Sequence, residues 1–153
     1  MIFEIVEPQA NLINNAEIIY CEKSRSFDCS IHVNSDINLT IAYLILGLDS
    51  EDMLVKSLWG FCPKESWKEM PLEIPLANKG ALRLVGEIEV GFVWRVDKNS
   101  RWQSFFDTIS GWYCIGKPMI EKNERAVKIM KNVVIVIDET GILDSIWIHP
   151  IFQ

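Results

Sequence analysis

Polar and apolar residues alternate along two stretches of the chain, 27–33 and 87–97. The apolar positions are Phe27, Cys29, Ile31 and Val33 in the first stretch and Ile88, Val90, Phe92, Trp94 and Val96 in the second. A period of two with one apolar face is typical of a half-buried antiparallel strand. We therefore predict strands over both stretches, and the second has the clearer pattern.

Continuous apolar runs predict further strands. Residues 133–137 form the β-branched run Val-Val-Ile-Val-Ile, which is typical of a central strand covered on both faces. The polar turn 138–141 ends in a glycine, as in a hairpin with a type I turn and a bulge. Residues 142–148 are expected to form the returning strand, which Pro150 ends. Weaker patterns predict strands over 2–6, 18–21 and 40–46.

Helical spacing predicts short helices between these strands. Apolar residues recur at i, i+3, i+4 and i+7 in Trp102, Phe105, Phe106 and Ile109. This spacing favours a helix that begins near residue 100 and ends before Gly111. A second helix is expected over 50–58, ending at Gly60. Residues 124–131 fit either a helix or a strand. The fold class that follows is α+β, a mainly antiparallel β-sheet with two to four short helices packed on it.

Length and composition favour one globular domain over residues 1–153. The chain is 49% hydrophobic and 24% charged, which is a composition that buries a core and excludes extensive disorder. No apolar run approaches the roughly 20 residues of a membrane-spanning helix. The first residues carry Glu4 and Glu7, where a signal peptide has positive charge. We therefore expect a cytoplasmic protein without a membrane contact.

The cysteines and histidines do not form a metal motif. Four cysteines lie at positions 21, 29, 62 and 114, with no Cys-x-x-Cys pair, and only two histidines are present. Structural zinc sites use clustered ligands, and cytoplasmic cysteines are normally reduced. No glycine pattern matches a phosphate-binding loop. We expect neither a metal nor a cofactor.

Negative charge is concentrated in the first third of the chain. Residues 1–55 contain nine acidic and two basic residues, a net charge of −7, whereas the remainder has 13 basic and 12 acidic residues, a net charge of +1. An acidic surface repels phosphate backbones, which argues against direct nucleic-acid binding. The same surface attracts a basic protein, although a solvated surface that maintains solubility has the same composition.

The stretch Trp59-Gly-Phe-Cys-Pro-Lys-Glu-Ser-Trp67 raises the question of thiol chemistry at Cys62. Cys62 precedes Pro63, which is a favoured first helical residue, and a helix N-terminus stabilises a thiolate. The apolar neighbours Trp59, Phe61 and Trp67 oppose ionisation. A catalytic cysteine also needs a base, and nothing in the sequence brings His32 or His149 near it. We expect Cys62 to be a packed residue.

In size, acidity and tryptophan content the chain is similar to bacterial immunity proteins, which bind and neutralise a cognate toxin. The likeness involves no motif, so it implies no residue roles. Our leading hypothesis is a non-enzymatic protein-binding domain that occludes a basic partner such as a toxin nuclease. Acidic side chains would steer association, and aromatic side chains would hold the complex. The candidate contact residues are Glu17, Glu22, Asp28, Asp36, Asp49, Glu51, Asp52, Trp59 and Trp67.

The alternative hypothesis is a small-molecule-binding or thiol-dependent enzymatic domain. Its pocket would be lined by Trp94, Trp102 and Trp112, with Cys62 as the reactive group. A subunit of a larger assembly is a third interpretation, and it predicts one broad apolar surface patch. The sequence leaves these interpretations open.

Overall fold

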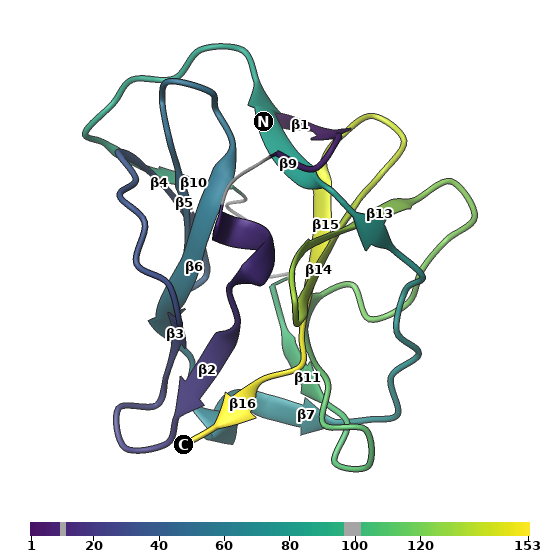
Figure 1. The fold of residues 1–153 in the computed structure, drawn as a ribbon. Coiled ribbons are helices and arrows are strands. Elements are labelled where there is room, and N and C mark those ends of the chain that lie inside the picture. The colour runs from purple at the N-terminus through teal and green to yellow at the C-terminus, as the bar shows by residue number, and fades with distance from the viewer. Residues whose placement is uncertain (10–11, 97–101) are drawn as a thin grey trace.

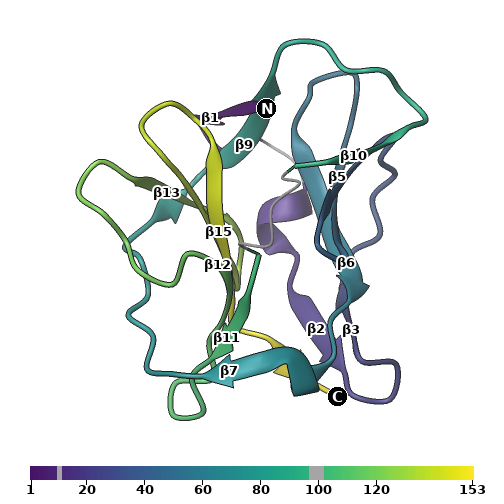
Figure 2. The same ribbon diagram turned by 180° about the vertical axis from the view of Figure 1, so that it is seen from behind.

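A computed structural model describes residues 1–9, 12–96 and 102–153, and it shows two β-sheets that face each other (Figures 1 and 2). The first sheet has the strand order β10 (Val93–Arg95), β4 (Ile37–Ile41), β5 (Leu44–Leu48), β6 (Val55–Phe61), β3 (Ser26–Cys29), β2 (Ile18–Cys21) and β16 (Ile151–Phe152). The second has the order β7 (Trp67–Glu69), β11 (Ser104–Phe106), β12 (Tyr113–Gly116), β15 (Leu143–Ile148), β14 (Val133–Ile137), β13 (Arg125–Met130) and β8 (Asn78–Lys79). A pair of strands, β1 (Ile2–Val6) and β9 (Ala81–Val85), forms a small third sheet.

The main core lies between the two large sheets. Strands of the first sheet alternate, so that Leu39, Leu46 and Leu58 are fully buried while the intervening side chains point outward. The second sheet contributes Ile135 and Ile146 from its central strands. Alternation with one buried face is the pattern expected of a sheet packed on a single core.

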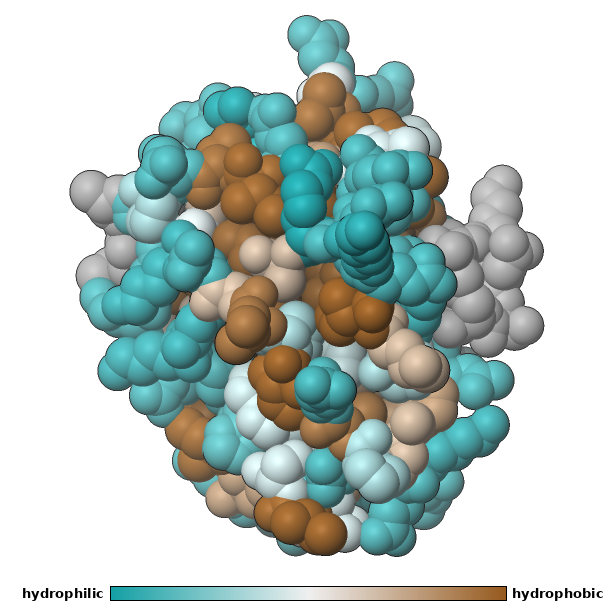
Figure 3. Space-filling model, turned by 90° about the vertical axis from the view of Figure 1, so that its right-hand side faces the viewer, coloured by the Kyte–Doolittle hydropathy of each residue, from teal (hydrophilic) through white to brown (hydrophobic). Residues whose placement is uncertain are grey.

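The second sheet is buried on its outer face as well. The extended segment 70–77 crosses this face, and Leu72 packs there against Val134, Val136 and Trp147. All five residues of β14 are consequently buried. Figure 3 views the molecule from this side and shows polar residues separating the apolar groups rather than one broad apolar patch.

The amide of Asn132 joins the two sheets. Its Oδ1 accepts from the backbone N–H of Ile18 at 2.8 Å, and its Nδ2 donates to the carbonyls of Ile18 at 2.9 Å and His149 at 2.8 Å. Asn132 is 8% exposed, so these bonds satisfy a buried amide. The bond to His149 lies where the chain passes from β15 in the second sheet to β16 in the first.

The α+β prediction is wrong, because 48% of the chain is strand and only 4% is helical. The helical segments in the described ranges are two short 3₁₀ turns, η1 (Leu12–Asn15) and η2 (Lys64–Ser66). Neither these turns nor any other described helix has the length and hydropathy for a helical membrane crossing. The helix predicted over 50–58 is a turn followed by β6. The described part of the helix predicted near 100–110 is β11 and a turn, whereas its expected start lies outside the described residues.

Several predicted strands are confirmed, and others are shorter than expected. The boundaries of β1, β2 and β14 agree with the prediction, and residues 125–130 form a strand, which settles the open choice for 124–131. The apolar run 40–46 divides into β4 and β5 around a two-residue turn. The predicted strand 27–33 ends at Cys29. Within the described residues 87–96, the strand predicted over 87–97 is reduced to β10, because residues 87–92 find no strand partner, and residue 97 lies outside the described residues.

Candidate functional site

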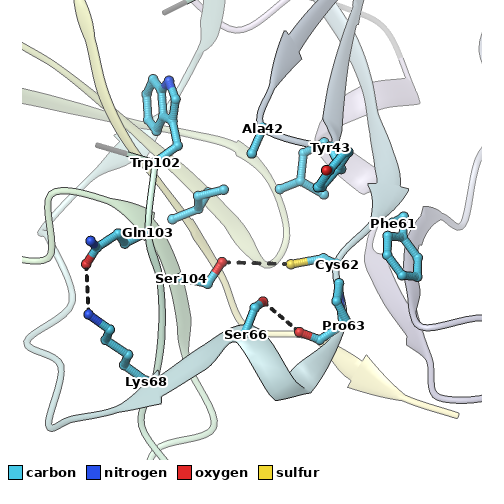
Figure 4. A pocket seen from close by; sticks show the side chains of 12 residues that line it. Ala42, Tyr43, Phe61, Cys62, Pro63, Ser66, Lys68, Trp102, Gln103 and Ser104 are labelled. Carbon is cyan, nitrogen blue, oxygen red and sulfur yellow. Dashed lines mark hydrogen bonds between the residues drawn. The ribbon is translucent and has the colours of Figure 1, made fainter. Parts of the chain in front are cut away.

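A pocket of about 340 Å³ lies where β6 leaves the first sheet and approaches β11 of the second (Figure 4). The side chains around it come from the β4–β5 turn, the end of β6, the η2–β7 segment, residues 102–104 at the start of β11, and β12. The lining residues are Ala42, Tyr43, Leu44, Phe61, Cys62, Pro63, Ser66, Lys68, Trp102, Gln103, Ser104 and Ile115. Most of these present apolar surface, and the volume is at the lower end of the range for small-molecule pockets.

Cys62 lies at the inner side of this pocket and is only 5% exposed. Its Sγ accepts a hydrogen bond from the indole N–H of Trp67 at 3.3 Å and contacts the hydroxyls of Tyr113 at 3.1 Å and Ser104 at 3.9 Å. The Tyr113 and Ser104 hydroxyls are 2.8 Å apart. The thiol is therefore one member of a buried polar group that holds the two sheets together.

This polar group contains no base for the thiol. Burial, and next the proximity of Cys62, raise the pKa of Tyr113 well above its usual value, so its phenol stays protonated. Within the described ranges, no histidine or carboxylate hydrogen-bonds to Sγ. His149 instead stacks on Trp112, with ring centroids 5.1 Å apart. Cys62 precedes a three-residue 3₁₀ turn rather than an α-helix, and no side chain caps that turn.

Gly60 explains how the chain forms the mouth of the pocket. Its φ of 138° is one that L side chains rarely adopt, and a Cβ there would collide with the carbonyl oxygen of Tyr43. The close approach brings the end of β6 against the β4–β5 turn. In that turn Ala42 has a φ of 55°, which costs conformational energy in a residue other than glycine.

Three aromatic side chains run from the pocket mouth onto the outer face of the first sheet, and we call them the aromatic stripe: Tyr43, Phe61 and Trp59. Tyr43 is 74% exposed and Phe61 48% exposed, and their rings meet edge to face with centroids 6.3 Å apart. Trp59 precedes Phe61 by two positions in β6, so strand alternation places both on the outer face. Water-exposed aromatic rings beside a preformed pocket resemble the hot spots of protein interfaces.

Trp67 and the tryptophans of the alternative pocket lie in different places. Trp67 packs inside an aromatic cluster with Tyr20 and Tyr113, at centroid distances of 5.0 Å, so it contributes to the core more than to a surface. Of Trp94, Trp102 and Trp112, Trp102 alone lines the pocket at Cys62. The structure does not bring the three together around one cavity there.

Several of the predicted acidic contact residues already have partners within the chain. Glu22 pairs with Lys64, Asp52 with Lys56 at 2.8 Å, and Glu17 with Lys131 at 3.5 Å. These pairs reduce the negative field that the sequence suggests.

Other predicted acidic residues accept hydrogen bonds within turns of the chain. The carboxylate of Asp36 accepts hydrogen bonds from the N–H and hydroxyl of Ser50, and these bonds lower its pKa. Asp49 accepts from the N–H of Glu51 at 2.9 Å in the same turn region. Asp28 and Glu51 are exposed. Asp28 lines a pocket together with a predicted tryptophan, Trp59, on the outer face of the first sheet.

Sequence reasoning missed a carboxyl pair formed by Glu124 and Asp144. Burial, and next the nearby Glu124, raise the pKa of Asp144 to about 6. Burial opposes the ionisation of Glu124, but a hydrogen bond from the protonated Asp144, the Glu121 backbone N–H and the nearby Lys117 outweigh it and lower its pKa. Oε2 of Glu124 has no hydrogen-bond donor in the structure, and a proton on Asp144 would supply one. The two residues lie 20 positions apart, so no local motif marks them.

Comparison with known proteins assigns no family. No family model matches the chain, and no curated protein sequence matches it. Among the described residues, no group of three or more histidines, cysteines, aspartates and glutamates has the geometry to hold a metal ion. All four cysteines are free thiols, and three of them are buried.

Proposed function

We propose that this protein is a non-enzymatic binding protein that engages another protein through the aromatic stripe and the adjoining pocket mouth. The observation that carries the proposal is the exposure of Tyr43 and Phe61, two aromatic rings in mutual contact beside a preformed apolar pocket. Exposed tyrosine and phenylalanine lose little conformational entropy on binding and bury a large area.

The partner that best fits the charge of the chain is a basic protein. The net charge of −6 favours association with a positively charged surface, and the acids without an intrachain ion pair among the described ranges include Asp28 and Glu51. Inhibition by occlusion, as in the bacterial immunity proteins that the chain resembles in size and composition, is the specific form of this proposal. A cytoplasmic site of action belongs to the same proposal.

The test is partner capture with matched surface variants. Wild type and the Tyr43→Ala/Phe61→Ala double variant are used as bait in an extract of the native organism, and captured proteins are purified and titrated by calorimetry. We expect a basic partner whose Kd rises at least about 30-fold in the double variant, because two hot-spot side chains together contribute roughly 2 kcal/mol or more. Ile109→Ala is the control, since this side chain is 97% exposed but lies in the β11–β12 turn.

Equal affinity of the double variant for the purified partner would contradict the proposal. The same would follow if the partner were acidic and its binding independent of salt, because complementary charge predicts weaker binding as ionic strength rises.

The pocket itself supports a second candidate function, the binding of a small apolar molecule. Its apolar lining and its volume of about 340 Å³ are the specific observations in its favour. The thiol-dependent version predicts rapid alkylation of Cys62 by iodoacetamide at neutral pH, followed by peptide mapping. Slow alkylation that tracks global unfolding would leave only the non-covalent version.

A further inference from the structure

A second pocket, of about 370 Å³, lies on the outer face of the first sheet, beside the aromatic stripe. Its sides are the outward side chains of β3, β4 and β6 and the loop 30–36 that connects β3 to β4. The residues that line it are Asp28, Cys29, Ile31, His32, Val33, Asn34, Ser35, Asn38, Ser57 and Trp59. The pocket thus joins two residues that sequence analysis singled out separately, Asp28 and Trp59.

Gly47 keeps the floor of this pocket open. It lies in β5 between Asn38 of β4 and Ser57 of β6, which are its register partners. A Cβ on Gly47 would collide with the hydroxyls of Ser35 and Ser57 and would lie 2.8 Å from the ring of Trp59. Its backbone φ is not of the positive kind that favours glycine. Glycine is therefore required here for lack of space, because the side chains of Ser35, Ser57 and Trp59 converge above this strand.

Two polar atoms of the pocket lack hydrogen-bond partners. Ser57 is only 6% exposed, and neither its Oγ nor the Oδ1 of Asn38 has a hydrogen-bond partner in the described part of the molecule. Buried polar groups are almost always hydrogen-bonded, so this pair of atoms is exceptional. An amide oxygen and a hydroxyl without partners call for a ligand that donates hydrogen bonds.

We propose that this pocket binds a guanidinium group, supplied by an arginine side chain of the basic partner. The identity of the partner rests on the proposed function, whereas the pocket chemistry does not. A planar guanidinium stacks on the indole of Trp59, which is the most favourable ring for a cation. Its N–H groups donate to Asn38 Oδ1, Ser57 Oγ and the carboxylate of Asp28, whose Oδ1 also accepts from the Cys29 N–H at 2.8 Å.

The charge of the lining favours a cation over an anion or a neutral sugar. Asp28 supplies a carboxylate, and the lining contains neither lysine nor arginine within the described residues. The lining also contains the titratable side chains of Cys29 and His32, so all binding is measured at one fixed pH of 8. A hydroxyl-rich sugar would also use the tryptophan and donate to the same acceptors, but it carries no positive charge to complement the Asp28 carboxylate.

The experiment is an NMR titration of the isotope-labelled protein with N-acetyl-arginine amide. We expect saturable shifts of the Trp59 indole N–H and the Asn38 side-chain amide, with a Kd on the order of 1 mM for a single side chain. The neutral isostere N-acetyl-citrulline amide should bind at least about tenfold more weakly, because it keeps the shape and loses the charge. Equal binding of the isostere, preferential binding of glucose, or no saturable shift at these groups would overturn the proposal.

Two variants and one matched control locate the interaction. Asp28→Asn removes the carboxylate but keeps an acceptor, and Trp59→Leu removes the π-face but keeps apolar bulk. Each should raise the Kd at least about threefold, since each removes one charged or cation–π interaction. Glu51→Gln changes the net charge by the same amount as Asp28→Asn but lies outside this lining, so it should leave the Kd unchanged. If all three variants weakened binding equally, the binding would not depend on this pocket, and the proposed site would be wrong.

The result is separable from that of the partner experiment. Free N-acetyl-arginine amide needs no protein partner, so failure of the titration removes the guanidinium pocket and leaves binding at Tyr43 and Phe61 intact. Conversely, a titration that succeeds while no basic partner is captured would support the pocket and refute the proposed function.

Discussion

A Ser-x-Trp pair occurs on a central strand of each sheet, and the two pairs have opposite environments. Ser145 and Trp147 lie on β15, where the segment 70–77 covers them; both are buried, and the Trp147 indole donates to Ser145 Oγ at 2.9 Å. Ser57 and Trp59 lie on β6, where the loop 30–36 leaves a pocket beside the pair; Ser57 is 6% exposed, and its Oγ has no partner. The same local sequence thus builds a second core in one sheet and an open polar pocket in the other.

The comparison shows that the packing of another segment over a sheet face, rather than side-chain chemistry, decides which residues of that face are available for binding. Both pairs present an indole and a hydroxyl on the outer face of a sheet. In the second sheet these groups satisfy each other and the interface excludes water. In the first sheet the serine hydroxyl has no partner and the indole of Trp59 is only partly buried, close to the exposed rings of Tyr43 and Phe61. We therefore place the proposed binding surface on the first sheet.

The largest expected effect is on thiol reactivity. Cys21 is partly exposed on β2 of the first sheet, and a hydrogen bond from Ser24 lowers its pKa. Cys114 is fully buried on β12 under the covered face, and burial raises its pKa well above the usual value. Iodoacetamide at pH 8 should modify Cys21 at least about 10³-fold faster, because a buried thiol reacts only after an opening that costs several kcal/mol.

Peptide mapping over a time course measures both rates. Comparable labelling of the two thiols in the native protein would mean that segment 70–77 does not stay on the sheet.

The second effect is on the free energy of unfolding. Trp147→Ala should destabilise the protein by about 3–5 kcal/mol, which is typical of truncating a fully buried large aromatic residue. Trp59→Ala is the matched variant on the open sheet, where partial exposure should limit the loss to about 1 kcal/mol. Urea unfolding followed by circular dichroism gives both values. Similar losses for the two variants would contradict the assignment of one covered and one open face.

A smaller difference is expected between the two serines. Ser145→Ala leaves the buried indole N–H of Trp147 without an acceptor, which should cost about 1–2 kcal/mol. Ser57→Ala removes a buried hydroxyl that has no partner, so the free energy of unfolding should stay within about 0.5 kcal/mol or increase. A loss at Ser57 equal to that at Ser145 would indicate that Ser57 already has a structural partner.

The sequence predicted those parts of the fold that depend on local pattern. β1, β2 and β14 have the expected boundaries because alternation or a β-branched run fixes a strand without reference to its neighbours. The spacing of Trp102, Phe105 and Phe106 imitated a helix, although two of these residues belong to β11, which pairs with β7 and β12, and one precedes it. Residues 87–92 alternate but form no strand, since a strand also needs a hydrogen-bonding partner.

The candidate site was only partly accessible from the sequence. Asp28 and Trp59 were identified, but their meeting in one pocket depends on the pairing of β3, β5 and β6. Tyr43 was missed because the apolar run 39–48 gives no turn signal: Ala42 adopts a positive φ without glycine, asparagine or proline nearby. The two Ser-x-Trp pairs are visible in the sequence, whereas the segment that covers one of them lies about 70 positions away.

The effect of the carboxyl pair at the start of β15 appears only as pH changes, and its sign follows from the direction of the pKa shifts. The pKa of Asp144 rises from 3.8 to about 6 on folding, so the folded protein binds more protons between these values. The contribution of Asp144 to the free energy of unfolding is fully present below pH 3.8 and is lost as pH rises through about 6. Glu124 has a lowered pKa, so its contribution is lost as pH falls. The pair therefore stabilises the fold most near pH 3.8–4.5, between the ordinary pKa values of the two carboxyls, and progressively less as pH rises toward 6.

Asp144→Asn tests this sign, because an amide does not ionise and carries N–H donors at every pH. We expect the variant to gain roughly 1–2 kcal/mol over wild type as pH rises from 5 to 8, with one pKa unit worth about 1.4 kcal/mol and partial exposure reducing the total. Urea unfolding across this range measures the difference, and Glu51→Gln on an exposed turn should show none. A constant difference between variant and wild type would mean that Asp144 ionises normally, and Glu124 Oε2 would then need another donor.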